Sequence, residues 1–215
     1  MRNTREQSLN GERFRRNHKD GLRLLLQTWR SLASDPIWDD EDDGQDDCSW
    51  WYGERASVSQ LAGAAWTLRG WAMQDYAWER RRPKGYAQID LCVDHPKLEL
   101  GFIAEAKQIW PRLTRPDLLA TRVDRAFKQL QRELGRVKPD GWPQRMFVFV
   151  APWTSTTKKA SLPVSDSMLR EFVSALGDLE GAAVWTFPWW ARNRKIDYVR
   201  RTDFYPGVAL LTREL

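Results

Sequence analysis

The chain has 215 residues, a formal net charge of +5 and a pI near 9.4, so it is long enough for one sizeable domain and basic enough to suit a polyanionic partner. Its two cysteines, Cys48 and Cys92, exclude a disulfide framework and a cysteine-based zinc site. No signal-peptide pattern and no apolar run of the roughly 20 residues needed to cross a membrane is present, so we expect a cytoplasmic protein without a membrane partner.

The N-terminal part of the chain predicts one helix followed by an acidic linker. Residues 12–33 place apolar side chains at helical spacing. The apolar side is formed by Leu22, Leu25, Leu26 and Trp29. Residues 34–47 are rich in aspartate and contain proline and glycine, which is typical of a solvated loop. We therefore expect an N-terminal helical extension (1–35), an acidic linker (36–50) and one larger domain (51–215).

The next segment predicts a second helix and then three strands. Residues 54–73 form the expected helix, with Ser57 as its N-cap. Residues 75–82 predict a short strand. Residues 85–95 and 98–110 alternate in polarity and are separated by turn-forming residues, which predicts an antiparallel hairpin. One face of its first strand would carry Ala87, Ile89, Leu91 and Val93, and the other Gln88, Asp90 and Cys92.

Residues 116–137 predict the clearest helix, with Pro116 in its first turn. Its apolar stripe consists of Leu119, Val123, Ala126, Phe127, Leu130, Leu134 and Val137. A second stripe, largely on the opposite side, is basic and consists of Arg122, Arg125, Arg132 and Arg136. The basic stripe is either an ordinary solvated helix face or a surface for the phosphates of a nucleic acid.

The C-terminal part of the chain alternates strands with one helix. Residues 145–153, 181–190 and 207–215 predict strands, and residues 165–179 predict a capped helix. The order of the expected elements is typical of an α/β fold in which helices flank one mixed central sheet.

Three residues of the predicted hairpin have chemically active side chains. Asp90 lies on the polar face of one strand, and Glu105 and Lys107 share the polar face of the other. Cross-strand neighbours lie about 5 Å apart, so the two carboxylates would repel each other unless a cation lies between them. Mg²⁺ suits such a site and can polarise a phosphodiester, and a lysine beside it can orient or help to deprotonate the attacking water.

The segments "AQIDLCV", with Asp90, and "IAEAK", with Glu105, Ala106 and Lys107, resemble the motif of the PD-(D/E)XK nuclease superfamily. That superfamily includes restriction endonucleases and Holliday-junction resolvases. The resemblance covers roughly residues 54–150, with "QID" in place of Pro-Asp, and implies a restriction-endonuclease-like core. It also implies that Asp90, Glu105 and the main-chain carbonyl of Ala106 bind Mg²⁺, for which Mn²⁺ can substitute, and that Lys107 assists the water.

The same resemblance implies further site residues. Glu54 occupies a place similar to the glutamate that many members carry on the helix before the hairpin, and Glu79 is the competing candidate. Gln129 resembles a glutamine of exonuclease-like members. The basic segment 192–201 is a further expected contact for phosphates. The residues expected to contact nucleic acid on the long helix are Arg122, Arg125, Gln129, Arg132 and Arg136.

These patterns predict a Mg²⁺-dependent DNA endonuclease of bacterial or phage defence or repair, with a homodimer or a partner protein as open alternatives. Two other functions are also open: a catalytically inactive nuclease fold that binds nucleic acid or serves in assembly, and a protein-interaction module. The 13 tryptophans either pack the core and loops or stack on exposed bases. The sequence lacks a phosphate loop, a dinucleotide fingerprint and the histidines that a triad or a His-rich metal site requires.

Overall fold

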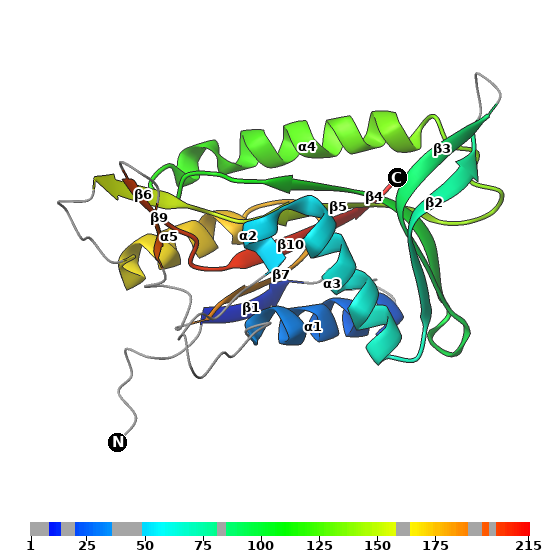
Figure 1. Cartoon of the computed structure of the whole chain (residues 1–215), viewed down its shortest axis with the longest axis horizontal. Coiled ribbons are helices and arrows are strands. Elements are labelled where there is room, and N and C mark those ends of the chain that lie inside the picture. Colours follow the sequence, from blue (N-terminus) through cyan, green and yellow to red (C-terminus); the bar gives the residue numbers. More distant parts are fainter. Residues whose placement is uncertain are drawn as a thin grey trace.

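A seven-stranded mixed sheet runs through the centre of the molecule, and helices cover both of its faces (Figure 1). The computed structural model describes residues 9–13, 20–35, 49–80, 85–157, 164–188, 195–197 and 201–215. The strand order is β1-β7-β10-β5-β4-β3-β2, in which β4 and β5 are parallel and the other neighbours antiparallel. The strands are β1 (Leu9–Arg13), β2 (Trp71–Glu79), β3 (Tyr86–His95), β4 (Leu100–Ile109), β5 (Gln144–Val150), β7 (Ala182–Phe187) and β10 (Val208–Glu214). The predicted α/β fold with a mixed, helix-flanked sheet is confirmed.

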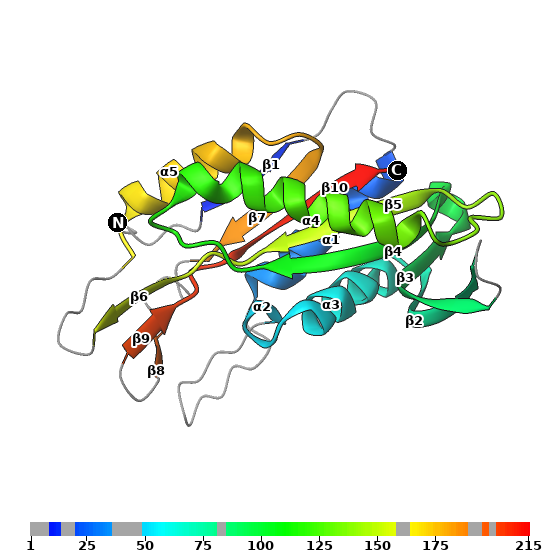
Figure 2. The ribbon, with the colours of Figure 1, turned by 90° about the horizontal axis from the view of Figure 1, so that it is seen from above.

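The helices divide between the two faces of this sheet (Figure 2). On one face lie α1 (Asp20–Ser34), α2 (Ser49–Tyr52) and α3 (Glu54–Thr67), and on the other lie α4 (Leu119–Leu134) and α5 (Asp166–Gly177). Short 3-10 turns precede β4 and α4, at Pro96–Leu98 and Pro116–Leu118. A separate small sheet has the order β6 (Thr154–Thr157), β9 (Arg201–Phe204) and β8 (Lys195–Asp197). Among the described helices, none combines the length and apolar character required to cross a membrane.

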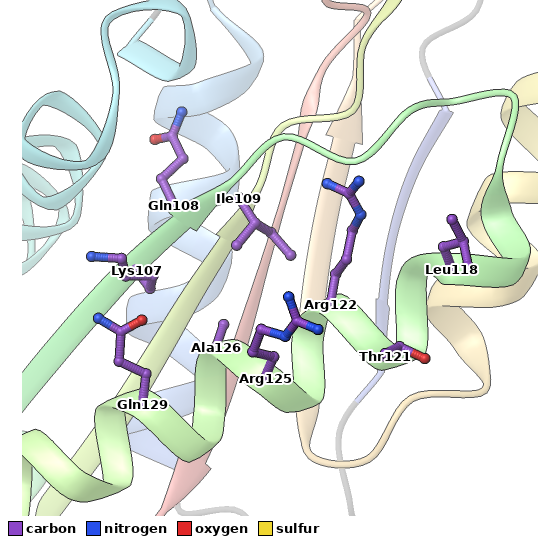
Figure 3. A pocket seen from close by; sticks show the side chains of 9 residues that line it. All are labelled: Lys107, Gln108, Ile109, Leu118, Thr121, Arg122, Arg125, Ala126 and Gln129. Carbon is purple, nitrogen blue, oxygen red and sulfur yellow. The ribbon is translucent and has the colours of Figure 1, made fainter.

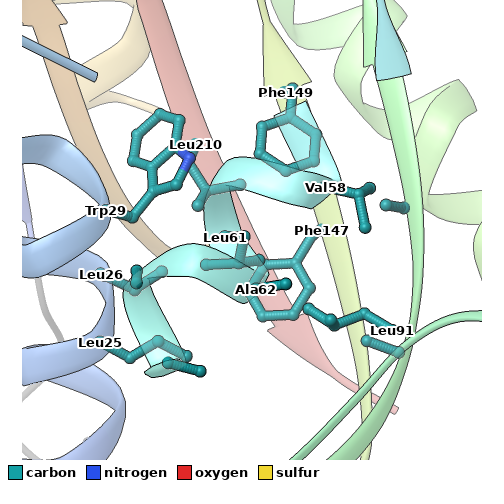
Figure 4. Packing of buried hydrophobic residues seen from close by; sticks show 14 of the residues in the cluster. Leu25, Leu26, Trp29, Val58, Leu61, Ala62, Leu91, Phe147, Phe149 and Leu210 are labelled. Atoms are coloured by element: carbon teal, nitrogen blue, oxygen red, sulfur yellow. The ribbon is translucent and has the colours of Figure 1, made fainter. Parts of the chain in front are cut away.

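Each face of the sheet buries its own apolar core. On the α1 and α3 side, Trp29 is fully buried, and its ring centroid lies 5.9 Å from that of Phe149 in β5 (Figure 4). Full burial of a large apolar side chain contributes about 1.5–3 kcal/mol. On the other side, α4 buries Leu119, Val123, Ala126, Phe127, Leu130 and Leu134, as predicted. These cores hold α3 and α4 against opposite faces of β4, so both helices lie beside the strand of the expected site.

The bounds of three predicted helices are wrong. The helix predicted over 116–137 is α4, which begins after the 3-10 turn at Pro116–Leu118 and ends before Val137. Glu12 and Arg13 belong to β1, an edge strand whose polar sequence does not alternate and which forms by pairing with β7. Residues 71–73 belong to β2, because α3 ends before them. Arg69 takes a left-handed φ of 64°, and the Gly70 N–H donates to the Ala65 carbonyl, which closes the helix.

Candidate active site

The predicted hairpin exists, but its two strands separate before they end. β3 pairs with β4 no further than Leu91 and Ala104. Beyond that pair, β3 continues along β2, whereas β4 continues along β5. The strands therefore form a fork, and Asp90 and Glu105 are the first residues past the last pair.

Two carboxylates occupy the edge of β4 that β3 leaves. Asp90 Oδ2 accepts a hydrogen bond of 2.7 Å from the Ala106 N–H, and Glu54 Oε2 accepts one of 2.8 Å from the Gln108 N–H. Alternate residues of a strand direct their N–H and C=O groups to the same edge, so these side chains replace main-chain partners and the Ala106 carbonyl faces the same edge. The two predicted protein ligands Asp90 and Ala106 thus lie together.

A local irregularity of the backbone directs Asp90 toward this edge. Gln74 pairs with Leu91 and Tyr76 pairs with Ile89, but Asp75 and Asp90, which lie between them, do not pair. Asp75 has a φ of 51°. As a result, Ile89 packs in the same cluster as Cys92, whereas Leu91 packs in the core on the α1 and α3 side. The predicted common face of Ile89 and Leu91 is therefore wrong, because the strand turns at Asp90.

Glu105 is the most strongly perturbed carboxyl of the fork. Its side chain is buried, and burial is the main reason that its pKa is raised to about 9. A hydrogen bond with Asp90 and the negative charges of Asp90, Glu133 and Glu54 contribute the rest of that rise. Without a cation, Asp90 and Glu105 form a pair in which Glu105 keeps its proton at neutral pH.

Lys107 lies two residues further along β4. Its Nζ atom is 3.5 Å from Glu54 Oε2, so the first turn of α3 holds the ammonium beside the fork. Both groups are partly exposed to solvent, where an ion pair contributes at most about 1 kcal/mol to stability. The pair therefore places the ammonium without burying it. Of the two predicted glutamates, the structure brings Glu54 to the site, whereas Glu79 pairs with Lys138 at 3.4 Å.

A groove of about 460 Å³ opens from Lys107 along α4. Figure 3 shows Lys107 and Gln129 at one end of this groove and Thr121 at the other, with Arg122 and Arg125 between them. Three of the residues expected to contact nucleic acid, Arg122, Arg125 and Gln129, therefore share the groove with Lys107. The lysine and the two arginines give it a positive charge.

The other predicted contacts lie elsewhere or outside the described residues. Arg132 and Arg136 are exposed but do not line the groove, and Arg132 Nε donates to the Lys128 carbonyl. In the basic segment 192–201, positions 192–194 and 198–200 lie outside the described residues.

A buried polar network behind the fork did not emerge from the sequence. Gln108 Nε2 donates to the Trp50 carbonyl at 2.8 Å, and the Ser57 hydroxyl donates to Gln108 Oε1 at 2.7 Å. Ser57 is thus a buried residue within α3, and its prediction as N-cap is wrong because Gly53, with a φ of 107°, takes that position. The network fastens α2 and the start of α3 to β4, which positions Glu54.

We expect Gln108→Leu to destabilise the protein by about 2–6 kcal/mol. The substitution leaves the Ser57 hydroxyl and the Trp50 carbonyl buried without this partner, and each such group costs about 1–3 kcal/mol. Urea unfolding followed by tryptophan fluorescence measures the change. Gln131→Leu, on the exposed side of α4, is the matched control. Equal stability of the two variants would contradict the role assigned to Gln108.

Glu133 is a second residue that sequence reasoning missed. It lies on α4, where Gln129 Nε2 donates to Glu133 Oε1 at 2.9 Å, and its charge acts on Glu105. Positions four apart share a helix face, so the spacing from Gln129 was the available signal. Glu133 adds a negative charge on the α4 side of the fork.

The residues at the fork fit a hard divalent cation. Within the residues that the structure describes, no three His, Cys, Asp or Glu side chains come together as a preformed metal cage. Mg²⁺ does not require one, because it keeps several waters and takes one or two carboxylates. Asp90 and Glu105, which are hydrogen-bonded to each other in the absence of a cation, and the Ala106 carbonyl provide oxygen atoms for that donor set.

Comparison of the chain with protein-family models, with curated proteins and with solved structures finds no match. The resemblance stated above therefore rests on the motif residues, and any function assigned to the chain rests on these residues and their geometry.

Proposed function

We propose that the chain is a Mg²⁺-dependent nuclease that hydrolyses DNA phosphodiesters as an endonuclease, in bacterial or phage defence or repair. The observation that carries the proposal is the fork, where Asp90, Glu105 and Lys107 lie at one point beside a basic groove. The consecutive order α3-β2-β3-β4-α4-β5 supports a restriction-endonuclease-like core, since a helix precedes the motif strands and a basic helix and buried strand follow.

Each residue of the fork has a role in this proposal. Asp90, Glu105 and the Ala106 carbonyl would hold Mg²⁺, which supplies polarisation of the scissile phosphate when bound. The Lys107 ammonium orients the attacking water and stabilises the negative charge that develops on the phosphate. Glu54 keeps the Lys107 ammonium at the fork.

The first test is cleavage by the wild-type protein. Supercoiled plasmid, single-stranded DNA and RNA are incubated with Mg²⁺, with Mn²⁺ or with EDTA. We expect DNA cleavage with either metal and none with EDTA. If no polymer is cut while salt-sensitive DNA binding persists, the chain is the inactive nucleic-acid-binding or assembly subunit instead.

The groove residues give a separate prediction about binding. Arg122→Ala combined with Arg125→Ala should weaken DNA binding and lower the slope of log Kd against log salt by about 1.4–1.8, because two phosphate contacts are lost. Fluorescence anisotropy at four salt concentrations measures the slope. Arg23→Ala removes an exposed arginine from α1, on the opposite face of the sheet, and serves as control. An unchanged slope in the double variant would remove the groove from the proposal.

A further inference from the structure

An aromatic ring stands exposed just after β4 ends, five residues beyond Glu105 in the chain. Trp110 directly follows the last residue of β4, and 41% of its surface is exposed. A Cβ atom placed on Gly53 would lie 3.9 Å from the Trp110 ring. Gly53 precedes Glu54, so the ring lies along the start of α3, close to the carboxylate that holds Lys107.

Guanidinium groups and a second indole extend this surface. Arg112 stacks over the Trp153 ring with its Cζ 5.3 Å from the centroid, and Trp153 Nε1 donates to the Trp110 carbonyl at 3.1 Å. Arg122 of the groove lies 3.5 Å from the same carbonyl. We call Trp110, Arg112 and Trp153 the Trp110 platform. Arg122 links the platform to the basic groove through the Trp110 main chain, while the Trp110 ring itself lies against the start of α3.

We propose that the Trp110 platform stacks on an unpaired base of the DNA strand whose phosphate lies at Lys107. This inference rests on the proposed function and names its substrate class: single-stranded DNA, or DNA with an unpaired stretch at the point of cleavage. Bases expose their faces only where they are unpaired, and exposed aromatic rings beside cationic grooves are the usual means of binding them.

Burial at the fork favours the same substrate. Glu105 is only 8% exposed, so a phosphate must come close to β4 to reach this carboxyl group. A single strand can enter there with its base turned toward Trp110. In a duplex the base faces are covered, and mainly phosphates and groove edges are accessible to a protein. The positive charge of Lys107, Arg122 and Arg125 matches a nucleic acid rather than an apolar protein segment.

The test measures binding by the wild-type protein in EDTA, which prevents metal-dependent cleavage. A labelled oligo-dT and a blunt hairpin duplex are titrated at one salt concentration and followed by fluorescence anisotropy. We expect the single strand to bind more tightly than the duplex. The Trp110→Ala substitution should lower the affinity for the single strand about tenfold and change the affinity for the duplex little. Trp110→Tyr should restore most of the affinity. A 2-aminopurine placed in the oligonucleotide should be quenched only when residue 110 is aromatic.

Trp66→Ala is the matched control, because Trp66 is 57% exposed at the other end of α3. Unchanged single-strand affinity in Trp110→Ala, or an equal loss on both DNAs, overturns the inference. It leaves the nuclease proposal intact if the wild-type protein cuts DNA. Failure of both oligonucleotides to bind also overturns it and favours a protein as the occupant of the platform. If single-strand binding depends on Trp110 but the wild-type protein does not cut DNA, the result supports the platform and refutes the proposed nuclease function.

Discussion

Lys107→Ala should lower the rate of metal-dependent DNA cleavage by about 10²–10⁴-fold while the protein stays folded. The ammonium is proposed to orient the attacking water and to stabilise the developing charge, and loss of one such group typically costs a factor in this range. Lys107 is partly exposed and pairs only weakly with Glu54, so its removal should change stability by less than about 1 kcal/mol. Initial rates on supercoiled plasmid, together with a thermal melt, measure both effects.

The matched control is Lys128→Ala, which removes an exposed lysine from α4 that pairs with Asp124 at 2.8 Å. Asp90→Asn should abolish cleavage as well, and it is preferable to alanine because its amide oxygen still accepts from the Ala106 N–H. If Lys107→Ala cuts as fast as Lys128→Ala, the catalytic role of Lys107 is refuted.

Glu105→Gln should make the metal-free protein more stable at pH 8–9 while it abolishes metal-dependent cleavage. The folded-state pKa of Glu105 is about 9, above the ordinary value of 4.5. A raised folded pKa gives stability that is complete below pH 4.5 and is lost as pH rises toward 9. Glutamine stays neutral, so the variant should avoid this loss, which is on the order of a few kcal/mol. Urea unfolding in EDTA between pH 4.5 and 9 measures the difference.

Mg²⁺ provides the second half of that experiment. Binding to the fork requires Glu105 to lose its proton, so Mg²⁺ should raise the melting temperature of the wild-type protein at pH 8 with release of a proton. Glu105→Gln should show a smaller shift. Glu180 is an exposed residue after α5, and Glu180→Gln controls for the loss of one negative charge. A metal-free Glu105→Gln protein less stable than wild type at pH 9 would contradict the burial argument.

Much of the fold around the site could be predicted because its signals are local. The long helix was predictable since its apolar stripe keeps the helical period and is buried as a unit in α4. The hairpin was predictable since Leu100, Phe102, Ala104 and Ala106 alternate with other residues and all face one core. Edge strand β1 was not predictable, because its pairing with β7 joins segments far apart in the chain and its sequence is polar.

The candidate site also has one part that could be predicted from the sequence and one part that could not. Asp90, Glu105 and Lys107 could be placed together from period-two geometry and a short turn. The separation of β3 from β4 could not be predicted, because it occurs next to the positive φ of Asp75, which lies on a third strand, β2. Contacts between Glu54 and β4 span more than fifty residues of sequence and depend on how α3 packs. Glu133 looks like any charge on an exposed helix until the packing of α4 brings it near Glu105.

Asp90 and Glu54 serve the fold as well as the proposed chemistry, since each pairs a main-chain N–H that the departing strand leaves without a partner. Their loss leaves a donor unpaired at a cost of about 1–3 kcal/mol, whereas Lys107 contributes only to a weak ion pair. Selection for folding alone should therefore keep the acids long after selection for cleavage has ended. Descendants that have lost activity are expected to drift first at Lys107, so the lysine distinguishes working enzymes from inherited scaffolds better than the aspartate does.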